Sequence, residues 1–138
     1  MIVLDTNVIS ELMRTAPSAS VLRWVDNLPL EDVYLTSITL AELLYGIARL
    51  PAGSRRERLE DHLGEMITVD FRARVLPFDT AAATHYADIA AHRASSGRPI
   101  SSADAQIAAV CRCHAATLAT RNIKDFADTA VTLINPWG

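Results

Sequence analysis

Short runs of apolar and β-branched residues alternate along the chain with longer segments in which apolar residues recur every three or four positions. The short runs are typical of buried strands, and the longer segments predict amphipathic helices. The predicted strands cover residues 1–4, 33–36, 75–78, 116–120 and 131–134, and the predicted helices cover 6–14, 21–28, 38–50, a segment that opens at 54, 80–95 and 101–113. A short polar link over 121–126 separates the last two strands.

This alternation of strands and helices predicts βαβ units. Such units build a mainly parallel sheet, here of about five strands, with helices on both faces in a three-layer α/β/α fold. Pro77 indicates that the third strand lies at an edge of the sheet or ends there. The chain has 138 residues without repeats or linkers, so we expect a single domain over residues 1–138.

The composition is that of an ordinary globular protein, with 50% hydrophobic and 21% charged residues. The net charge of −3 gives no general attraction for nucleic acid, so any RNA or DNA must be bound by a local group of basic residues. All but one of the 13 basic residues are Arg, which suits bidentate phosphate contacts. The N-terminus has no signal-peptide pattern, and no apolar run is long enough to span a bilayer. We therefore expect a cytoplasmic protein without membrane contact.

Three acidic residues interrupt apolar surroundings where predicted elements begin or end. Asp5 follows the first strand, Glu42 lies in the first turns of the helix over 38–50, and Asp104 lies at the start of the helix over 101–113. Each also has a purely structural explanation, because Asp is a preferred N-cap and both 39–42 and 101–104 match the capping-box pattern. In a parallel sheet, however, the carboxyl ends of the strands share one edge, so the fold predicts that the three acids converge.

Converging carboxylates repel one another. At roughly 4 Å and an effective dielectric of about 20, each pair costs about 4 kcal/mol, so the cluster must protonate, spread apart or bind a cation. Hard oxygen ligands without neighbouring Cys or His favour Mg²⁺ or Mn²⁺ over zinc, and Mg²⁺ typically binds one or two carboxylates together with phosphate. The pattern therefore predicts a metal site for phosphoryl chemistry.

Four motifs, in this order, resemble those of the PIN-domain ribonucleases, and within them the VapC toxins and the similar FitB proteins. The motifs are IVLDTNVIS over 2–10, ELLYG over 42–46, DAQIAA over 104–109 and TRNIKDF over 120–126, so the resemblance covers essentially the whole chain. It implies a Mg²⁺-dependent endoribonuclease, the toxin of a type II toxin–antitoxin pair. It also implies an RNA substrate, a small DNA-binding antitoxin as partner, and a homodimer.

The resemblance also assigns roles to individual residues. Asp5, Glu42 and Asp104 match the catalytic, metal-binding acids, with Asp5 and Asp104 as the principal ligands and Glu42 acting directly or through water. The auxiliary positions are Thr6 and Asn7, which brace Asp5, and Thr120, Asn122 and Asp125. The expected RNA contacts are Arg98, Arg121 and Lys124, with the arginines of 55–58 as a further basic group.

Asn122 departs from the family pattern, which often has a fourth acid at this position. A neutral amide is a weaker cation ligand, so the number of bound metals, one or two, stays open, and Asp125 is placed to compensate in part. The departure also supports an alternative function, a catalytically weak or silent PIN-fold module that acts through a DNA-binding partner. A phosphatase with a nucleophilic Asp5 is less favoured, because such enzymes usually carry a second Asp where this chain has Asn7.

Overall fold

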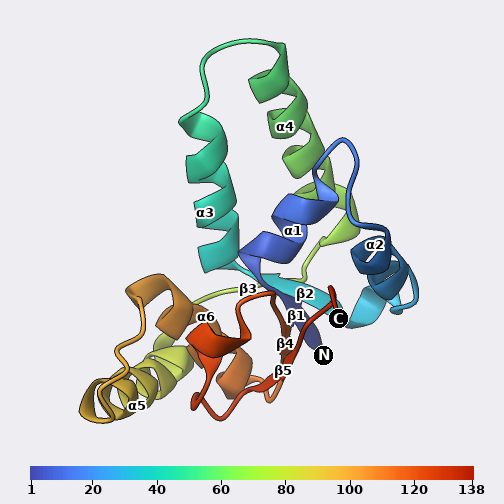
Figure 1. Ribbon diagram of the computed structural model, residues 1–138. Helices are drawn as coiled ribbons and strands as arrows, with labels where there is room; N and C mark the ends of the chain where they lie inside the picture. The colour runs from blue at the N-terminus through green and yellow to red at the C-terminus, as the bar shows by residue number, and fades with distance from the viewer.

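The five strands form one sheet in which every neighbouring pair is parallel, in the order β3-β2-β1-β4-β5 (Figure 1). This computed structural model describes all residues from Met1 to Gly138. The strands are β1 (Ile2–Leu4), β2 (Val33–Thr36), β3 (Val75–Leu76), β4 (Thr117–Ala119) and β5 (Thr132–Ile134). The predicted parallel sheet is confirmed, and β3, which ends before Pro77, lies at an edge as expected.

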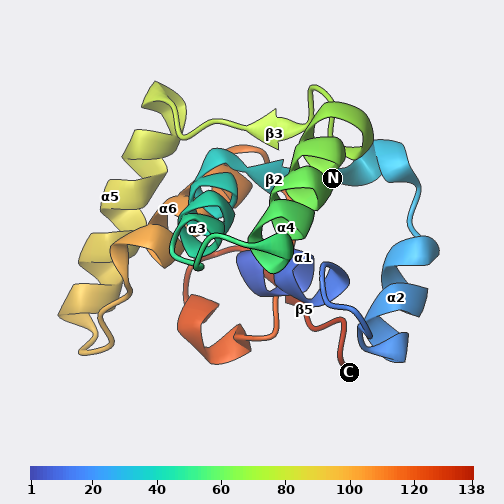
Figure 2. The same cartoon turned by 90° about the horizontal axis from the view of Figure 1, so that it is seen from above.

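Helices cover both faces of the sheet (Figures 1 and 2). They are α1 (Thr6–Leu12), α2 (Ala19–Asp26), α3 (Ser37–Ala48), α4 (Ser54–Glu65), α5 (Thr80–Ser95) and α6 (Ser102–Cys113). Three further turns are the 3₁₀ helices η1 (Leu30–Asp32) and η3 (Ile123–Phe126) and the π-helical η2 (Met66–Asp70). None of these helices has the length and apolar character that crossing a membrane requires.

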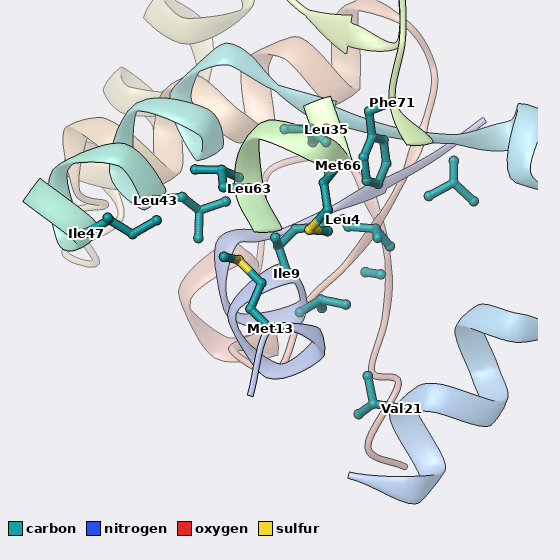
Figure 3. Close-up of a cluster of buried hydrophobic side chains, with 13 residues drawn as sticks. Leu4, Ile9, Met13, Val21, Leu35, Leu43, Ile47, Leu63, Met66 and Phe71 are labelled. Carbon is teal, nitrogen blue, oxygen red and sulfur yellow. The ribbon is translucent and has the colours of Figure 1, made fainter. Parts of the chain in front are cut away.

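Successive strand residues point into two separate cores. Leu4 and Leu35 pack on the face that α1 to α4 cover, whereas Val3 and Leu118 pack against α5, α6 and η3. Figure 3 shows the first core, in which side chains of α3, α4 and η2 gather with those of α1 around Leu4. The three-layer α/β/α arrangement is therefore confirmed.

The link over 121–126 is more ordered than the sequence pattern indicates. It contains η3, whose Phe126 is only 1% exposed and belongs to the second core. Burial of this ring holds the preceding polar residues in a helical turn instead of an open link. The polar residues of the segment are thereby fixed next to the end of β4.

Polar side chains cap the starts of two helices that carry acids of the site: Thr36, at the end of β2, caps α3, and Ser101, in the loop after α5, caps α6. The Oγ1 of Thr36 accepts the N–H of Thr39 at 3.1 Å, and the Oγ of Ser101 accepts the N–H of Asp104 at 3.2 Å. The Ser101 cap was predicted, but the capping box over 39–42 was wrong. Because α3 already begins at Ser37, Glu42 lies beyond its first turn and takes no part in capping.

The C-terminus of α6 generates a stability prediction. It closes with N–H donation from Ala116 to the Cys111 carbonyl at 2.9 Å and from Ala115 to the Arg112 carbonyl at 3.2 Å, a Schellman motif. Ala115 has φ 52°, a left-handed conformation in which a Cβ atom is unfavourable. We expect Ala115→Gly to raise the free energy of unfolding, measured by urea denaturation, by about 0.5–1 kcal/mol.

The matched control is Ala91→Gly, at an exposed position within α5. Glycine inside a helix costs about 1 kcal/mol, so this variant should be destabilised. Equal losses of stability in both variants would contradict the role given to the conformation of Ala115.

Candidate active site

The three predicted acids line one open cleft, with a volume of about 490 Å³, at the carboxyl end of the sheet. Asp5 follows β1, Glu42 is on α3, and Asp104 lies in the first turn of α6. Their convergence follows from the parallel topology, as expected. The other lining residues are Thr6, Asn7, Ser10, Glu11, Arg14, Arg121, Asn122 and Trp137.

Asp5 is the most enclosed of these acids, with 4% of its surface exposed. Its Oδ1 accepts the Thr6 N–H at 2.8 Å, and its Oδ2 accepts the Thr120 hydroxyl at 2.7 Å and the Asn7 amide at 3.3 Å. Asn7 therefore braces Asp5, as predicted. Because both oxygens of the Asp5 carboxylate accept hydrogen bonds, these three donors fix its orientation.

The electrostatic environment disfavours negative charge on two of the acids. Burial raises the pKa of Asp5 from 3.8 to about 6, and the carboxylates of Asp104 and Glu42 add to this shift against the hydrogen bonds from Thr120 and Thr6. Burial also raises the pKa of Asp104, and the neighbouring Asp125 and Glu42 act in the same direction. Repulsion among these carboxylates is what a bound cation would relieve.

Thr6 connects two of the acids. Its N–H donates to Asp5, and its hydroxyl donates to Oε1 of Glu42 at 2.6 Å. The sequence predicted only a bracing role towards Asp5. In the structure, the Thr6 side chain instead orients Glu42, which is otherwise exposed on the rim of the cleft.

Thr120 connects Asp5 to Asn122, the position at which the PIN-domain family often has a fourth acid. The Thr120 hydroxyl oxygen accepts the backbone N–H of Asn122 at 3.0 Å while it donates to Asp5. Asn122 lines the cleft together with the three acids. Asp125 is exposed and does not line the cleft; it acts on the site through the pKa of Asp104.

A buried arginine of α5 joins two loops outside the lining of the cleft. Arg93 of α5 is 5% exposed and forms no ion pair. Its Nε donates to the Arg98 carbonyl at 2.6 Å, and its Nη1 donates to the carbonyls of Asp125 and Ala127 at 2.8 and 2.9 Å. Arg93 therefore joins the loop before α6 to η3 and its following residue.

The three cations predicted to bind RNA lie in different places. Arg121 lines the cleft, whereas the guanidinium of Arg98 pairs with Asp128 outside it, and Lys124 is exposed but does not line it. Arg55 and Arg58 line a neighbouring groove of about 670 Å³ among α1, α3 and α4, which meets the cleft at Thr6, Ser10, Arg14 and Glu42. The structure thus brings only Arg121 of the three to the acids.

Sequence reasoning missed four lining residues, Ser10, Glu11, Arg14 and Trp137. Glu11 is 7% exposed, accepts the Ser18 N–H at 3.0 Å and forms an ion pair with Arg14 at 3.2 Å. Both contacts lower the pKa of Glu11, and the hydrogen bond from the Ser18 N–H has the larger effect. An acid within the apolar segment after Asp5 was a usable signal for Glu11. Trp137 belongs to no motif and reaches the cleft only through the tertiary fold.

The donors in the cleft are hard carboxylate and amide oxygens, which fit a divalent cation such as Mg²⁺ that keeps several of its waters. No three Asp, Glu, His or Cys side chains are close enough together to form a complete set of metal ligands. The site therefore supplies a partial oxygen ligand set, braced by Thr6, Asn7 and Thr120.

Comparison with known proteins gives close relatives. The family model described as PIN domain matches residues 2–131. The VapC ribonuclease Y4jK of Sinorhizobium fredii is 44% identical over 137 residues, covering 99% of this chain and 98% of that protein. Toxin FitB of Neisseria gonorrhoeae is also 44% identical over 137 residues, with 99% of each chain covered.

Among solved structures, FitAB bound to an IR36 DNA fragment superimposes with a TM-score of 0.94 at 43% identity, covering 100% of this chain and 96% of that one. The family match, the relatives and the shared fold agree with the four motifs that surround the cleft. The chain belongs to the PIN-domain family.

Proposed function

We propose that this protein is a divalent-metal-dependent endoribonuclease and the toxin of a type II toxin–antitoxin pair. The observation that carries the proposal is the meeting of Asp5, Glu42 and Asp104, from three separate elements, in one open cleft. The relatives named VapC ribonuclease and toxin FitB support the same activity. The substrate is RNA, and the bond hydrolysed is a phosphodiester.

Asp5 and Asp104 would hold the Mg²⁺ or Mn²⁺ ion, and Glu42 would contact it directly or through water. Such an ion, when bound, neutralises phosphate charge and lowers the pKa of a water that attacks in line. The protein's own contribution is orientation: Thr120 and Asn7 fix Asp5, and Thr6 fixes Glu42. The lining residues include no His or Cys, so no imidazole base or cysteine nucleophile is assigned.

The toxin role requires a partner that blocks the cleft. FitAB bound to DNA, which this chain resembles closely, supports a small DNA-binding antitoxin as that partner. The groove beside the cleft combines apolar side chains, among them Met13, Leu43 and Leu59, with Arg55 and Arg58. This surface suits the tail of an antitoxin, and the toxin itself is proposed to be a homodimer.

The first test is cleavage of a structured RNA by the purified, partner-free protein. We expect cleavage in Mg²⁺ and none in EDTA, and a loss of at least about 100-fold in rate for Asp5→Asn and for Asp104→Asn, because each removes a charged ligand. The exposed Asp61→Asn, on α4, is the control for loss of one negative charge and should cleave normally. Cleavage that survives EDTA would contradict the metal mechanism, and a folded protein that never cleaves would favour the silent module.

The burial of Asp5 predicts a pH-dependent gain of stability in Asp5→Asn. Because the folded-state pKa of about 6 exceeds the unfolded value of 3.8, the protonated group favours folding fully below about pH 4, and this contribution is lost as the pH rises through about 6. Asparagine does not ionise. The free energy of unfolding of Asp5→Asn, relative to the unmodified protein, should therefore rise by up to about 3 kcal/mol between about pH 4 and about pH 7.5.

This measurement is made without metal and then repeated with Mg²⁺. Mg²⁺ should raise the Tm of the unmodified protein and of Asp61→Asn, because a ligand that binds the folded state stabilises it, but not the Tm of Asp5→Asn. A pH-independent difference, or a full Mg²⁺ shift in Asp5→Asn, would remove Asp5 from its proposed role.

The fourth position predicts a gain of metal affinity. Asn122 lines the cleft beside the acids, and replacing its amide with a carboxylate adds a charged oxygen ligand. We expect Asn122→Asp to bind Mg²⁺ about tenfold more tightly by calorimetry. Asn27→Asp, at the exposed end of α2, is the control and should not change the affinity. An unchanged affinity for Asn122→Asp would exclude a ligand role for this position.

A further inference from the structure

Arg121 and Trp137 form a stacked pair at the acid cleft. Arg121 follows the end of β4, Trp137 lies after β5, and both line the cleft that holds Asp5 and Asp104. The guanidinium carbon of Arg121 lies over the indole ring of Trp137, 5.0 Å from the ring centroid. At this distance the aromatic face attracts the cation.

Arg121 is the unpaired cation of this cleft. Of the two arginines in the lining, Arg14 forms an ion pair with Glu11, whereas Arg121 forms none. The four carboxylates of the lining repel an incoming phosphate, and Arg121 is the one cation there that forms no ion pair, although its charge helps to lower the pKa of Glu11. A stacked guanidinium keeps its edge N–H groups free, and these match phosphate oxygens in a bidentate way.

Both members of the pair are held in place. Trp137 is half-buried and packs against the first core, and its backbone N–H donates to Oδ1 of Asn135 at 3.0 Å. The backbone N–H of Arg121 donates to Oδ1 of Asn7 at 3.3 Å, and the amide of Asn7 donates to Asp5. The position of the Arg121–Trp137 pair relative to Asp5, which is proposed to bind metal, is therefore fixed.

We propose that Arg121 binds a phosphate of a single-stranded RNA substrate beside the scissile bond, and that Trp137 is the positioning residue that holds Arg121 there. The inference rests on the proposed function for the identity of the substrate. An exposed arginine on a flexible stem loses conformational freedom when it binds. Contact with Trp137 restricts the conformations of the Arg121 side chain before RNA binds. Less conformational entropy is then lost on binding, so Trp137 increases the affinity for RNA through Arg121.

The test measures kcat and KM on a short single-stranded RNA in Mg²⁺ over a range of salt concentrations. Arg121→Gln should raise KM about tenfold with little change in kcat. The fall of log(kcat/KM) with log salt should also become shallower by about 0.7, the value for one phosphate contact on a single strand. Trp137→Leu should reproduce most of both effects without any change of charge. Trp137→Phe, which keeps an aromatic face, should restore most of the affinity.

The double variant distinguishes the mechanisms. If Trp137 acts through Arg121, Trp137→Leu adds almost nothing in the Arg121→Gln background. If Trp137→Leu costs the same in both backgrounds, Trp137 contacts RNA itself and the positioning role is wrong. An unchanged KM in Trp137→Leu would make the pair purely structural and overturn the proposal.

Two matched controls accompany these variants. Trp24→Leu makes the same chemical change at a half-buried residue of α2 outside the cleft, and Arg49→Gln breaks the other arginine–aromatic stack, on Tyr45, 5.6 Å from the ring centroid. Neither should change KM. RNA binding by the same variants is also followed by fluorescence anisotropy. If the protein binds RNA in a way that depends on Trp137 but never cleaves it, the proposed hydrolysis is overturned and this inference stands. Absence of both binding and cleavage by the unmodified protein would overturn both.

Discussion

Asp5 follows the central strand, β1, with its carboxylate almost fully removed from water, and a buried charge without partners is strongly unfavourable. Donors from two parts of the chain meet this requirement: the Thr6 N–H and the Asn7 side chain at the start of α1, and the Thr120 hydroxyl just after β4. The same donors fix where β1, α1 and β4 meet. The arrangement still leaves the pKa of Asp5 at about 6, so hydrogen bonding offsets only part of the cost.

The remaining cost explains why the polar network is so closely connected. Thr6 serves Asp5 with its backbone and Glu42 with its side chain, and Thr120 donates to Asp5 while it accepts from Asn122. Thr6 thus connects Asp5 to Glu42, and Thr120 connects Asp5 to Asn122. Burial and mutual repulsion of these acids oppose folding, and the hydrogen bonds offset part of that cost, which is the usual conflict between stability and function at such sites.

The sequence was sufficient for the fold and for the acids, and physical reasons separate what it predicted from what it missed. Periodicity identifies buried strands, and parallel pairing then places Asp5, Glu42 and Asp104 at one edge without any knowledge of side-chain contacts. Helix starts were less certain, because Thr36 and Thr39 are both acceptable caps and only packing selects Thr36. Arg98 and Lys124, predicted as RNA contacts, do not line the cleft, and Trp137 was missed, since long-range side-chain contacts leave no local pattern.

Arg93 has a consequence for motion in this part of the molecule. Its buried guanidinium is satisfied only by carbonyls from two loops, the one before α6 and the one that contains η3. If either loop detaches, a buried charge loses its acceptors, which is far more costly than the loss of an ordinary surface hydrogen bond. We therefore expect the two loops to detach together and not one at a time, with a shared free energy of local unfolding.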